Sequence, residues 1–303
     1  MKGIILAAGA GTRLYPASQP ISKILLPIYD KPMIYYPLST LMLANIKDIL
    51  IITNKTDYDN FEKLLGDGSQ FGINIQYKIQ YVQKGIADAF IIAEDFINGD
   101  DVALVLGDNI FHGFGFSTML KGVISRHDGA TVFGYRVNDP ERFGVVEFDE
   151  NMKALSLEEK PQNPKSNYAV TGLYFYDKYV CEYAKSLTVS ARGELEITDL
   201  NKIYLQKNKL NVEILGRGFT WLDTGTQDAM LEASNFVRTI EKNKGEQISC
   251  LEEIALYKSF TTPEQLEEKL SKFKGKSSYY DYVFNLINQE KLKKNNPKKV
   301  LCL

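Results

Sequence analysis

A glycine-rich turn follows the first apolar segment of the chain. Residues Gly3 to Ala8 predict a buried strand, and the turn after them contains Gly9, Gly11 and Arg13. Glycine lets backbone N–H groups approach phosphate oxygens closely, and a nearby arginine can neutralise their charge. The turn therefore predicts phosphate binding, with a purely structural turn as the alternative.

Two other glycine motifs do not fit this turn. A P-loop is excluded because no Gly-Lys-Ser or Gly-Lys-Thr follows these glycines. A dinucleotide-binding turn fits poorly, because Leu14 stands where the third glycine is expected and three prolines between residues 16 and 27 interrupt the helix that should follow. Asp30 lies near the position of a ribose-binding acid, but it carries little weight without that helix.

Two acidic residues directly follow apolar segments further along the chain. Val102 to Leu106 is so continuously apolar that it predicts a central strand covered on both faces, and Asp108 comes just after it. Asp223 follows Trp221 and Leu222 in the same way. Open α/β sheets bind ligands at the carboxyl ends of strands, and Mg²⁺ is commonly held by one or two carboxylates plus substrate phosphates. Asp108 and Asp223 therefore predict a magnesium site.

The elements that must position these residues alternate between strands and helices. This alternation predicts an α/β fold with a mostly parallel sheet. The first half predicts strands at 48–53, 73–80 and 102–106, and helices at 58–65, 86–95 and from Pro32 onward. The second half predicts closely spaced strands at 130–138, 144–148, 154–159 and 169–176, and strands at 211–215 and 220–222 that return to the sheet. The closely spaced strands are expected to cover the substrate.

The chain after Gly245 predicts short helices. Thr262-Pro263 followed by Gln265 is typical of a helix start, so residues 246–290 are expected to form a helical appendage to a core of residues 1–245. Residues 291–303 carry five lysines and no acidic side chain. They predict a solvated basic tail, with an anion-docking site as the alternative.

Composition excludes several classes of protein. The 303 residues include 36 Lys and Arg against 38 Asp and Glu, and a net charge of −2 excludes nucleic-acid binding through bulk positive charge. No apolar stretch approaches the roughly 18 residues that span a bilayer. Cys181, Cys250 and Cys302 are too widely spaced to predict a disulfide framework or a zinc site, and His112 and His127 lie in no evident triad. We therefore expect a cytoplasmic protein without membrane or nucleic-acid partners.

Several ordered motifs together resemble the sugar-1-phosphate nucleotidylyltransferases. The motifs are Leu6 to Pro16, Ser22 to Pro27, Leu106 to Asn109, Glu158 to Pro161 and Trp221 to Thr226. Longer stretches are similar to one branch, the glucose-1-phosphate thymidylyltransferases: Asp30 to Met42, Asn138 to Phe148, Ser166 to Tyr176 and Ser190 to Asp199. The resemblance implies a three-layer α/β/α nucleotidyltransferase fold with a mixed, mostly parallel sheet. It also implies Mg²⁺-dependent transfer of dTMP from dTTP to glucose 1-phosphate, the first step of dTDP-deoxysugar synthesis of the rhamnose type.

The resemblance also implies a role for each matching residue. The nucleotide-binding residues would be Gly9, Gly11, Thr12, Arg13, Lys23, Gln80 and Gly85. The sugar and its phosphate would bind to a subregion near residues 130–200 and to Asn109, which follows Asp108. The residues that bind them would be Asn109, Gly144, Glu159, Lys160, Val170 and Arg192. Asp108 and Asp223 would hold Mg²⁺, and the catalytic charges would be Arg13, Lys23 and Lys160. The family further implies a homotetramer with feedback inhibition by a dTDP-sugar.

Two departures from the family pattern and three alternatives qualify this interpretation. Ala8 stands where the family often has glycine, and Asp88 replaces the amide of the usual Leu-Ala-Gln-Ala segment with a charge close to the expected base contacts. The alternatives are the same chemistry with UTP, the same chemistry with another sugar 1-phosphate, and a catalytically silent nucleotide-binding regulatory subunit. Because Arg13, Lys160 and both acids are present, the silent subunit is the least favoured.

Overall fold

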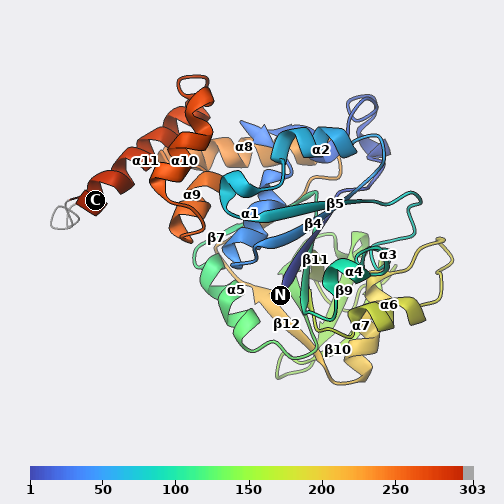
Figure 1. Ribbon diagram of the computed structural model, residues 1–303. Helices are drawn as coiled ribbons and strands as arrows, with labels where there is room; N and C mark the ends of the chain where they lie inside the picture. The colour runs from blue at the N-terminus through green and yellow to red at the C-terminus, as the bar shows by residue number, and fades with distance from the viewer. Residues whose placement is uncertain (296–303) are drawn as a thin grey trace.

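A nine-stranded sheet forms the centre of the molecule (Figure 1). The computed structural model describes residues 1–295. The strands of the sheet are β1 (Lys2–Leu6), β4 (Asp48–Thr53), β5 (Asn74–Ile79), β6 (Val102–Leu106), β8 (Ala130–Arg136), β9 (Gly144–Phe148), β10 (Ala154–Glu159), β11 (Tyr168–Tyr176) and β12 (Leu210–Leu215). Four more strands pair outside it: β2 (Pro27–Ile28) with β3 (Lys31–Pro32), and β7 (Asn109–Gly113) with β13 (Phe219–Asp223).

The sheet is parallel on one side and mixed on the other. Strands β6, β1, β4 and β5 lie side by side in that order and run parallel, so their carboxyl ends meet at one edge. Strand β11 is antiparallel to β6, β8 is antiparallel to β11, and β12 is parallel to β8. Strands β9 and β10 form an antiparallel pair that joins β11 only near Ala169. The predicted mixed, mostly parallel order is confirmed for the central strands.

The helices cover both faces of this sheet. They are α1 (Tyr35–Leu43), α2 (Tyr58–Leu65), α3 (Asp88–Ile92), α4 (Glu94–Ile97), α5 (Phe116–Ser125), α6 (Val180–Ser186), α7 (Ile197–Gln206), α8 (Gln227–Lys244), α9 (Leu251–Tyr257), α10 (Pro263–Leu270) and α11 (Ser278–Asn295). Side chains alternate along each strand, so Ile5 packs in one core with α1, α5 and α8 while Ile4 packs in another with α3, α4, α6 and α7. Two apolar cores on opposite faces make the predicted three-layer α/β/α fold.

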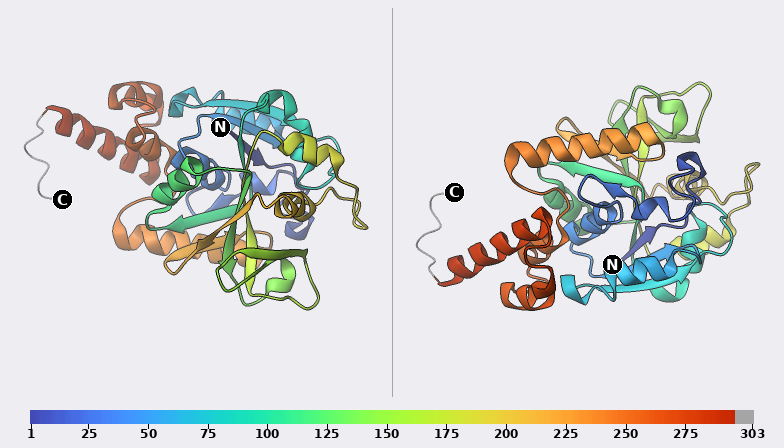
Figure 2. Two further views of the ribbon diagram at one scale, coloured as in Figure 1. Left: turned by 90° about the horizontal axis from the view of Figure 1, so that it is seen from below. Right: turned by 90° about the horizontal axis from the view of Figure 1, so that it is seen from above.

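The C-terminal helices α9, α10 and α11 gather at one end of the molecule, away from α6 and α7 (Figures 1 and 2). Leu251, Leu266 and Val283 from these helices are buried in the same core as Ile5. Thr262 caps α10 as predicted, because its side chain accepts from the N–H of Gln265 and the Gln265 side chain accepts from the N–H of Thr262. Helix α11 runs to Asn295, so the start of the expected basic tail is helical, and residues 296–303 lie outside the described residues.

Three sequence-based predictions of elements differ from the structure. Pro32 does not open a helix: it pairs with Pro27 in the β2–β3 hairpin, and the helix begins only at Tyr35. The helix expected at 86–95 is two short helices, with Ala93 between them. The strand expected at 220–222 does not return to the main sheet, because β13 pairs instead with β7, a strand that sequence reasoning missed. Within residues 1–295 no helix is both long and apolar enough to cross a membrane.

Candidate active site

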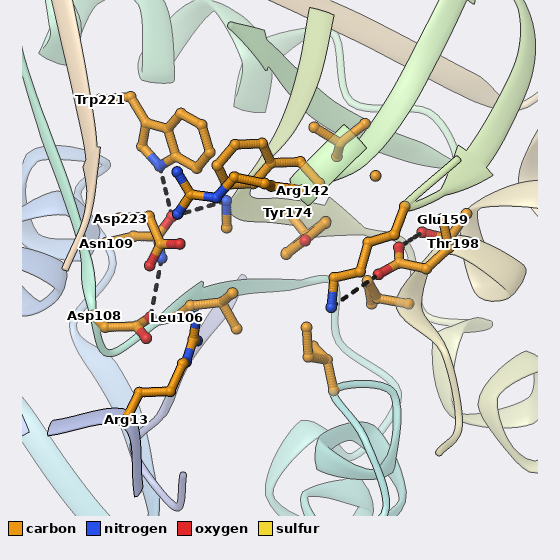
Figure 3. Close-up of a pocket in the computed structure, with 17 residues that line it drawn as sticks. Arg13, Leu106, Asp108, Asn109, Arg142, Glu159, Tyr174, Thr198, Trp221 and Asp223 are labelled. Atoms are coloured by element: carbon orange, nitrogen blue, oxygen red, sulfur yellow. Dashed lines mark hydrogen bonds and ion pairs between the residues drawn. The ribbon is translucent and has the colours of Figure 1, made fainter. Parts of the chain in front are cut away.

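A cavity of about 270 Å³ opens where β6 ends and the mixed part of the sheet begins. Four of the predicted site residues line one end of it: Arg13, Asp108, Asn109 and Asp223. Four others line the opposite end: Gly144, Glu159, Lys160 and Val170. Figure 3 shows Asp108 and Asp223 on one side and Glu159 on the other, facing the same space. The structure therefore brings together residues that are far apart in the chain, such as Arg13 and Asp223.

Asp108 is held by partners on both sides. Its Oδ2 atom accepts a hydrogen bond from the Lys23 ammonium, and its Oδ1 atom accepts from Asn109 Nδ2 at 3.0 Å. Burial raises the pKa of this carboxyl, but the charge of Lys23 and these hydrogen bonds outweigh burial, so the pKa lies below its ordinary value. Asp108 is thus a paired, ionised group at the end of the central strand β6.

Asp223 lies in the opposite electrostatic situation. No hydrogen bond or ion pair joins its carboxylate to another side chain among residues 1–295. Burial and then the charge of Asp108 raise its pKa, and Lys23, Arg13 and Arg142 only partly offset this from a distance. Arg13 reaches this point over Gly225, where an added Cβ would lie 3.1 Å from Arg13 Nη2 and 3.3 Å from Asp223 Oδ1.

These two acids fit a divalent cation. Asp223 is a carboxylate with no bonded partner beside a second carboxylate, which is the charge arrangement that a cation relieves. Within the described part of the chain no three His, Cys, Asp or Glu side chains cluster as a complete metal cage. A cation held by two carboxylates therefore needs further ligands, such as water and the oxygens of a bound phosphate.

Asn109 fixes the geometry between the two acids. Its Oδ1 atom accepts from the Trp221 indole N–H at 2.6 Å and from the backbone N–H of Gly172 at 3.1 Å (Figure 3). Its Nδ2 atom donates to Asp108. The amide thus ties β7, β11 and β13 together where they meet the carboxyl end of β6, and it orients Asp108.

The other end of the cavity is built on the antiparallel strands. Glu159 ends β10 and accepts at 2.5 Å from the Thr198 hydroxyl, at the start of α7. An added Cβ at Gly144 would lie 3.2 Å from that hydroxyl, 3.3 Å from Glu159 Oε2 and 3.9 Å from Val170 Cβ. Gly144, Glu159 and Val170, which the family resemblance groups together, therefore form one wall.

Two cations stand beside Glu159. Lys160 Nζ lies 3.9 Å from Glu159 Oε1, and Arg192 Nη2 lies 3.3 Å from the same oxygen. Arg192 does not line the cavity itself, because the buried carboxylate of Glu196 holds its guanidinium with two hydrogen bonds of 2.9 and 2.6 Å. The hydrogen bonds to Glu196 raise the pKa of Arg192, so its charge is fixed.

The glycine turn lies against Lys23. Gly9, Thr12 and Arg13 are exposed to solvent at the carboxyl end of β1, and Gly11 adopts a φ of 63° that favours glycine. An added Cβ at Gly11 would lie 3.3 Å from Lys23 Cβ. The turn therefore offers exposed backbone next to the Lys23–Asp108 pair, which is a suitable place for a phosphate.

Gln80 and Gly85 lie on the neighbouring loop and do not line the cavity. Gln80 is buried just beyond β5, and its Nε2 atom donates to Asp88 Oδ2 at 2.9 Å. Gly85 has a φ of 94°, and an added Cβ would lie only 2.5 Å from the Leu195 carbonyl oxygen. Close packing against Leu195 alone therefore requires glycine here, whether or not a ligand approaches it.

Sequence reasoning missed several residues that line the cavity. They include Ile86, Arg142, Phe143, Tyr174, Thr198 and Trp221. Arg142 is the most notable, because it adds a cation on the Asp223 side of the cavity while pairing with Asp139 at 2.6 Å (Figure 3). The motif Asp139-Pro140-Glu141-Arg142 has only a turn signal, so nothing local reveals where the guanidinium lies.

Comparisons with known proteins agree with this geometry. The sequence profile of the nucleotidyl transferase family matches residues 2–240. A glucose-1-phosphate thymidylyltransferase from Neisseria gonorrhoeae is 58% identical over 289 residues, covering 95% of this chain and 100% of that protein. One from Mycolicibacterium smegmatis is 52% identical over 290 residues, covering 96% of this chain and 100% of that protein.

Solved structures are similar in fold. A Bacillus anthracis chain described as a glucose-1-phosphate thymidylyltransferase, in complex with sucrose, is 42% identical with a TM-score of 0.73 and covers 78% of this chain and 95% of its own. A UDP-glucose pyrophosphorylase complexed with UDP-glucose has a TM-score of 0.68 at 24% identity, covering 79% of this chain and 98% of its own. The second likeness concerns the fold alone.

Proposed function

The chain belongs to the nucleotidyl transferase family, and on that premise we propose that it transfers dTMP from dTTP to glucose 1-phosphate. The products are dTDP-glucose, a precursor for dTDP-deoxysugars, and pyrophosphate. One observation carries the proposal: a single cavity joins a carboxylate pair beside a glycine turn to a second end that is lined by Lys160, with Arg192 behind it against Glu159. The first end suits a nucleoside triphosphate, and the second suits a sugar phosphate.

The reaction needs no protein nucleophile or general base. A phosphate oxygen of glucose 1-phosphate, already an anion, forms a bond to the α-phosphorus of dTTP while the bond to the β-phosphate oxygen breaks and pyrophosphate leaves. Arg13 and Lys23 stabilise the charge that develops on the triphosphate, and Lys160 and Arg192 hold the phosphate of the sugar. Catalysis is then positioning and charge stabilisation.

The family uses a divalent metal, and we infer that Mg²⁺ is held here by Asp108 and Asp223. The bound cation supplies neutralisation of the triphosphate charge. Lys23 and Asn109 keep Asp108 ionised and correctly oriented, and the raised pKa of Asp223 makes this carboxylate the one that gains most from a cation.

The glucose is proposed to bind against the wall of Gly144, Glu159 and Val170. Glu159 presents a carboxylate that is oriented by Thr198, and such a group can accept hydrogen bonds from sugar hydroxyls. Asn109 would contribute its remaining N–H hydrogen, since Asp108 takes only one of the two. Gly144 leaves room because it carries no side chain toward this wall.

The base is proposed to be read by Gln80 and Gly85. Gln80 offers a donor and an acceptor to the thymine edge, and loss of a buried hydrogen-bond partner costs about 1–3 kcal/mol. Gln80→Ala should therefore lower kcat/KM for dTTP by roughly one to two orders of magnitude. An unchanged efficiency and an unchanged dTTP-to-UTP ratio in competition kinetics would place base reading elsewhere.

A panel assay tests the function as a whole. Pyrophosphate release is measured with dTTP, UTP, dCTP and ATP against glucose 1-phosphate and other sugar 1-phosphates. We expect dTTP with glucose 1-phosphate to give the highest kcat/KM, and UTP to be accepted less well, because a single methyl group is worth only about 1–3 kcal/mol in a pocket. If another pair of nucleoside triphosphate and sugar 1-phosphate gave a higher kcat/KM, that pair would be the substrates instead. If no pair gave pyrophosphate release, a catalytically silent regulatory subunit would be favoured.

A homotetramer with feedback inhibition by a dTDP-sugar at a separate site is also proposed. This proposal rests on the family resemblance, and large apolar side chains that an assembly could cover include Phe114, which is fully exposed, and Tyr257 and Leu231, which are largely so. Light scattering at four times 34.3 kDa is expected, and scattering at 34.3 kDa itself would contradict it. Inhibition that is purely competitive with dTTP would contradict a separate site.

A further inference from the structure

Asp88 is a buried carboxylate whose one described side-chain partner is Gln80. It opens helix α3, while Gln80 stands directly after strand β5. The two side chains are only 8% and 7% exposed, and Gln80 Nε2 donates to Asp88 Oδ2 at 2.9 Å. The sequence made Asp88 look like a disturbance of the base site, whereas the structure gives the charged side chain a partner.

This contact decides which way the Gln80 amide faces. A carboxylate accepts hydrogen bonds and cannot donate them, so only the NH₂ side of the amide can face Asp88. The reverse orientation would place Gln80 Oε1 against Asp88 Oδ2, two acceptors with little water between them. The amide carbonyl is therefore turned away from Asp88, with one N–H hydrogen still free beside it.

The backbone around the pair is fixed. The N–H of Gln80 donates to Thr53 O at 2.8 Å, which continues the β4–β5 pairing by one residue. On the other side of the loop, Leu195 N donates to Lys84 O at 2.6 Å and Ala87 N donates to Leu195 O at 3.3 Å. The backbone at Gln80 and just before Asp88 is thus held by hydrogen bonds to other segments, so the two side chains start from fixed positions.

The same loop contacts the phosphate turn. Gln83 Nε2 donates to the carbonyl of Ala8 at 2.8 Å, immediately before Gly9. Ile86, two residues before Asp88, lines the cavity. If the phosphates of a nucleotide lie at the glycine turn, its base therefore lies close to the loop that carries Gln80 and Asp88.

We propose that Asp88 is a specificity-determining positioning residue, which locks the Gln80 amide so that the site accepts pyrimidines with an N3–H group and rejects cytosine. The inference rests on the proposed function, in which Gln80 faces the base. Thymine and uracil present a donor at N3 and an acceptor at O4, which match the free Oε1 and N–H of Gln80. Cytosine presents an acceptor at N3 and a donor at N4, so both contacts are reversed. A site built for one hydrogen-bond pattern rejects the other strongly.

The test is the ratio of kcat/KM for dCTP to that for dTTP in the full-length Asp88→Asn variant. Asparagine has nearly the same shape but can donate as well as accept, so the Gln80 amide becomes free to turn over. In the wild type we expect dCTP to be at least about 100-fold worse than dTTP, with dUTP accepted. In Asp88→Asn we expect the dCTP-to-dTTP ratio to rise by about tenfold or more.

Asp95→Asn is the matched control, because Asp95 lies seven residues away on α4 and pairs with Lys78 at 2.5 Å on the surface. The control should keep the wild-type ratio, and Asp88→Glu should keep the ratio as well because it retains a carboxylate. A loss of efficiency with both nucleotides at an unchanged ratio in Asp88→Asn would make Asp88 merely structural and overturn the inference.

The wild-type protein alone also tests the inference, in case Asp88→Asn does not fold. Use of dCTP within tenfold of dTTP by the wild type would overturn it. Failure of the proposed function looks different, since no nucleotide would then support pyrophosphate release with a sugar 1-phosphate.

Discussion

The two ends of the active-site cavity hold their charges in different ways. At the sugar end, Glu159 is bonded to Thr198 and Arg192, and Arg192 is fixed by Glu196. At the metal end, Asp108 is paired with Lys23, but Asp223 has no bonded partner within residues 1–295. Paired charges need no ligand to be stable, whereas an unpaired, partly buried carboxylate lowers the stability of the empty protein. The charged groups of the sugar end are therefore already paired before substrate binds, whereas Asp223 at the metal end gains a partner only when a cation binds.

The largest effects should come from the two acids. Asp108→Asn and Asp223→Asn should each lower kcat by about 1000-fold or more, because several kcal/mol of charge stabilisation depend on the pair. Asp108→Asn should also destabilise the protein by about 3 kcal/mol, because it leaves the buried Lys23 ammonium without its partner. Steady-state kinetics and chemical denaturation measure the two effects.

Asp128→Asn is the control for these variants. Asp128 forms an exposed pair with Lys209 far from the cavity, and loss of such a pair costs less than about 1 kcal/mol. Activity within tenfold of the wild type in either active-site variant would contradict the assignment of both acids to the metal.

The pH profile should distinguish the two acids. As the pH falls, Asp223 is protonated first because its pKa is raised, while Asp108 stays ionised because its pKa is lowered. A cation needs the carboxylate form, so activity should be lost as the pH falls through the pKa of Asp223, above the ordinary aspartate range. Because Mg²⁺ and the proton compete for this group, the acid limb of kcat/KM should move to lower pH as Mg²⁺ is raised. If the acid limb did not depend on the Mg²⁺ concentration, the assignment of Asp223 as an unpaired carboxylate that binds the cation would be contradicted.

A smaller and more selective effect is expected at the sugar end. Lys160→Ala and Arg192→Ala should each raise the KM for glucose 1-phosphate by about 10- to 100-fold, since a lost charge-assisted hydrogen bond costs roughly 1.5–3 kcal/mol. The KM for dTTP should change little. The exposed Arg126, which pairs with Glu213, offers Arg126→Ala as a control without effect. If both variants raised only the KM for dTTP, the assignment of dTTP and glucose 1-phosphate to the two ends of the cavity would be the wrong way round.

Part of this site could be predicted from the sequence because it follows from local patterns. A continuous apolar run predicts a central strand, and ligands bind at the carboxyl end of such a strand. The residues just before Asp108 therefore place it at a ligand-binding edge of the sheet. The glycine turn after β1 is similarly local. The alternation of strands and helices predicted an α/β fold with a mostly parallel sheet, whereas the three layers were implied by the family resemblance.

The rest depends on contacts between distant parts of the chain. Strand β7 is as long as β6, but only Ile110 and Phe111 in it are strongly apolar, and it exists because it pairs with β13, about 110 residues later. Arg142 and Thr198 enter the cavity from a turn and a helix start, and no periodic pattern reveals such directions. Asp88 could be seen as a departure in the sequence, but only the structure shows that it faces Gln80.

The smallest effect should come from Trp221→Phe. Phenylalanine keeps the aromatic packing against Tyr135 and Phe143 but removes one of the two donors that hold Asn109 Oδ1. Because the N–H of Gly172 still holds this oxygen, we expect kcat/KM to fall only about fivefold, as for one hydrogen bond of about 1 kcal/mol. A loss above 100-fold would mean that the indole itself contacts substrate, and no loss would mean that the Asn109 network does not orient Asp108.

The melting temperature of Asp223→Asn relative to the wild type tests the difference between the two ends most directly. With a chelator present and at a pH well above the raised pKa of Asp223, this carboxylate is ionised without a bonded partner and destabilises the fold, so the variant should melt at a higher temperature than the wild type. With Mg²⁺ and dTTP, the wild type should gain stability that the variant cannot gain, and the order should reverse. A variant that melts below the wild type in chelator would contradict the claim that the Asp223 carboxylate lacks a stabilising partner until the cation and the nucleotide bind.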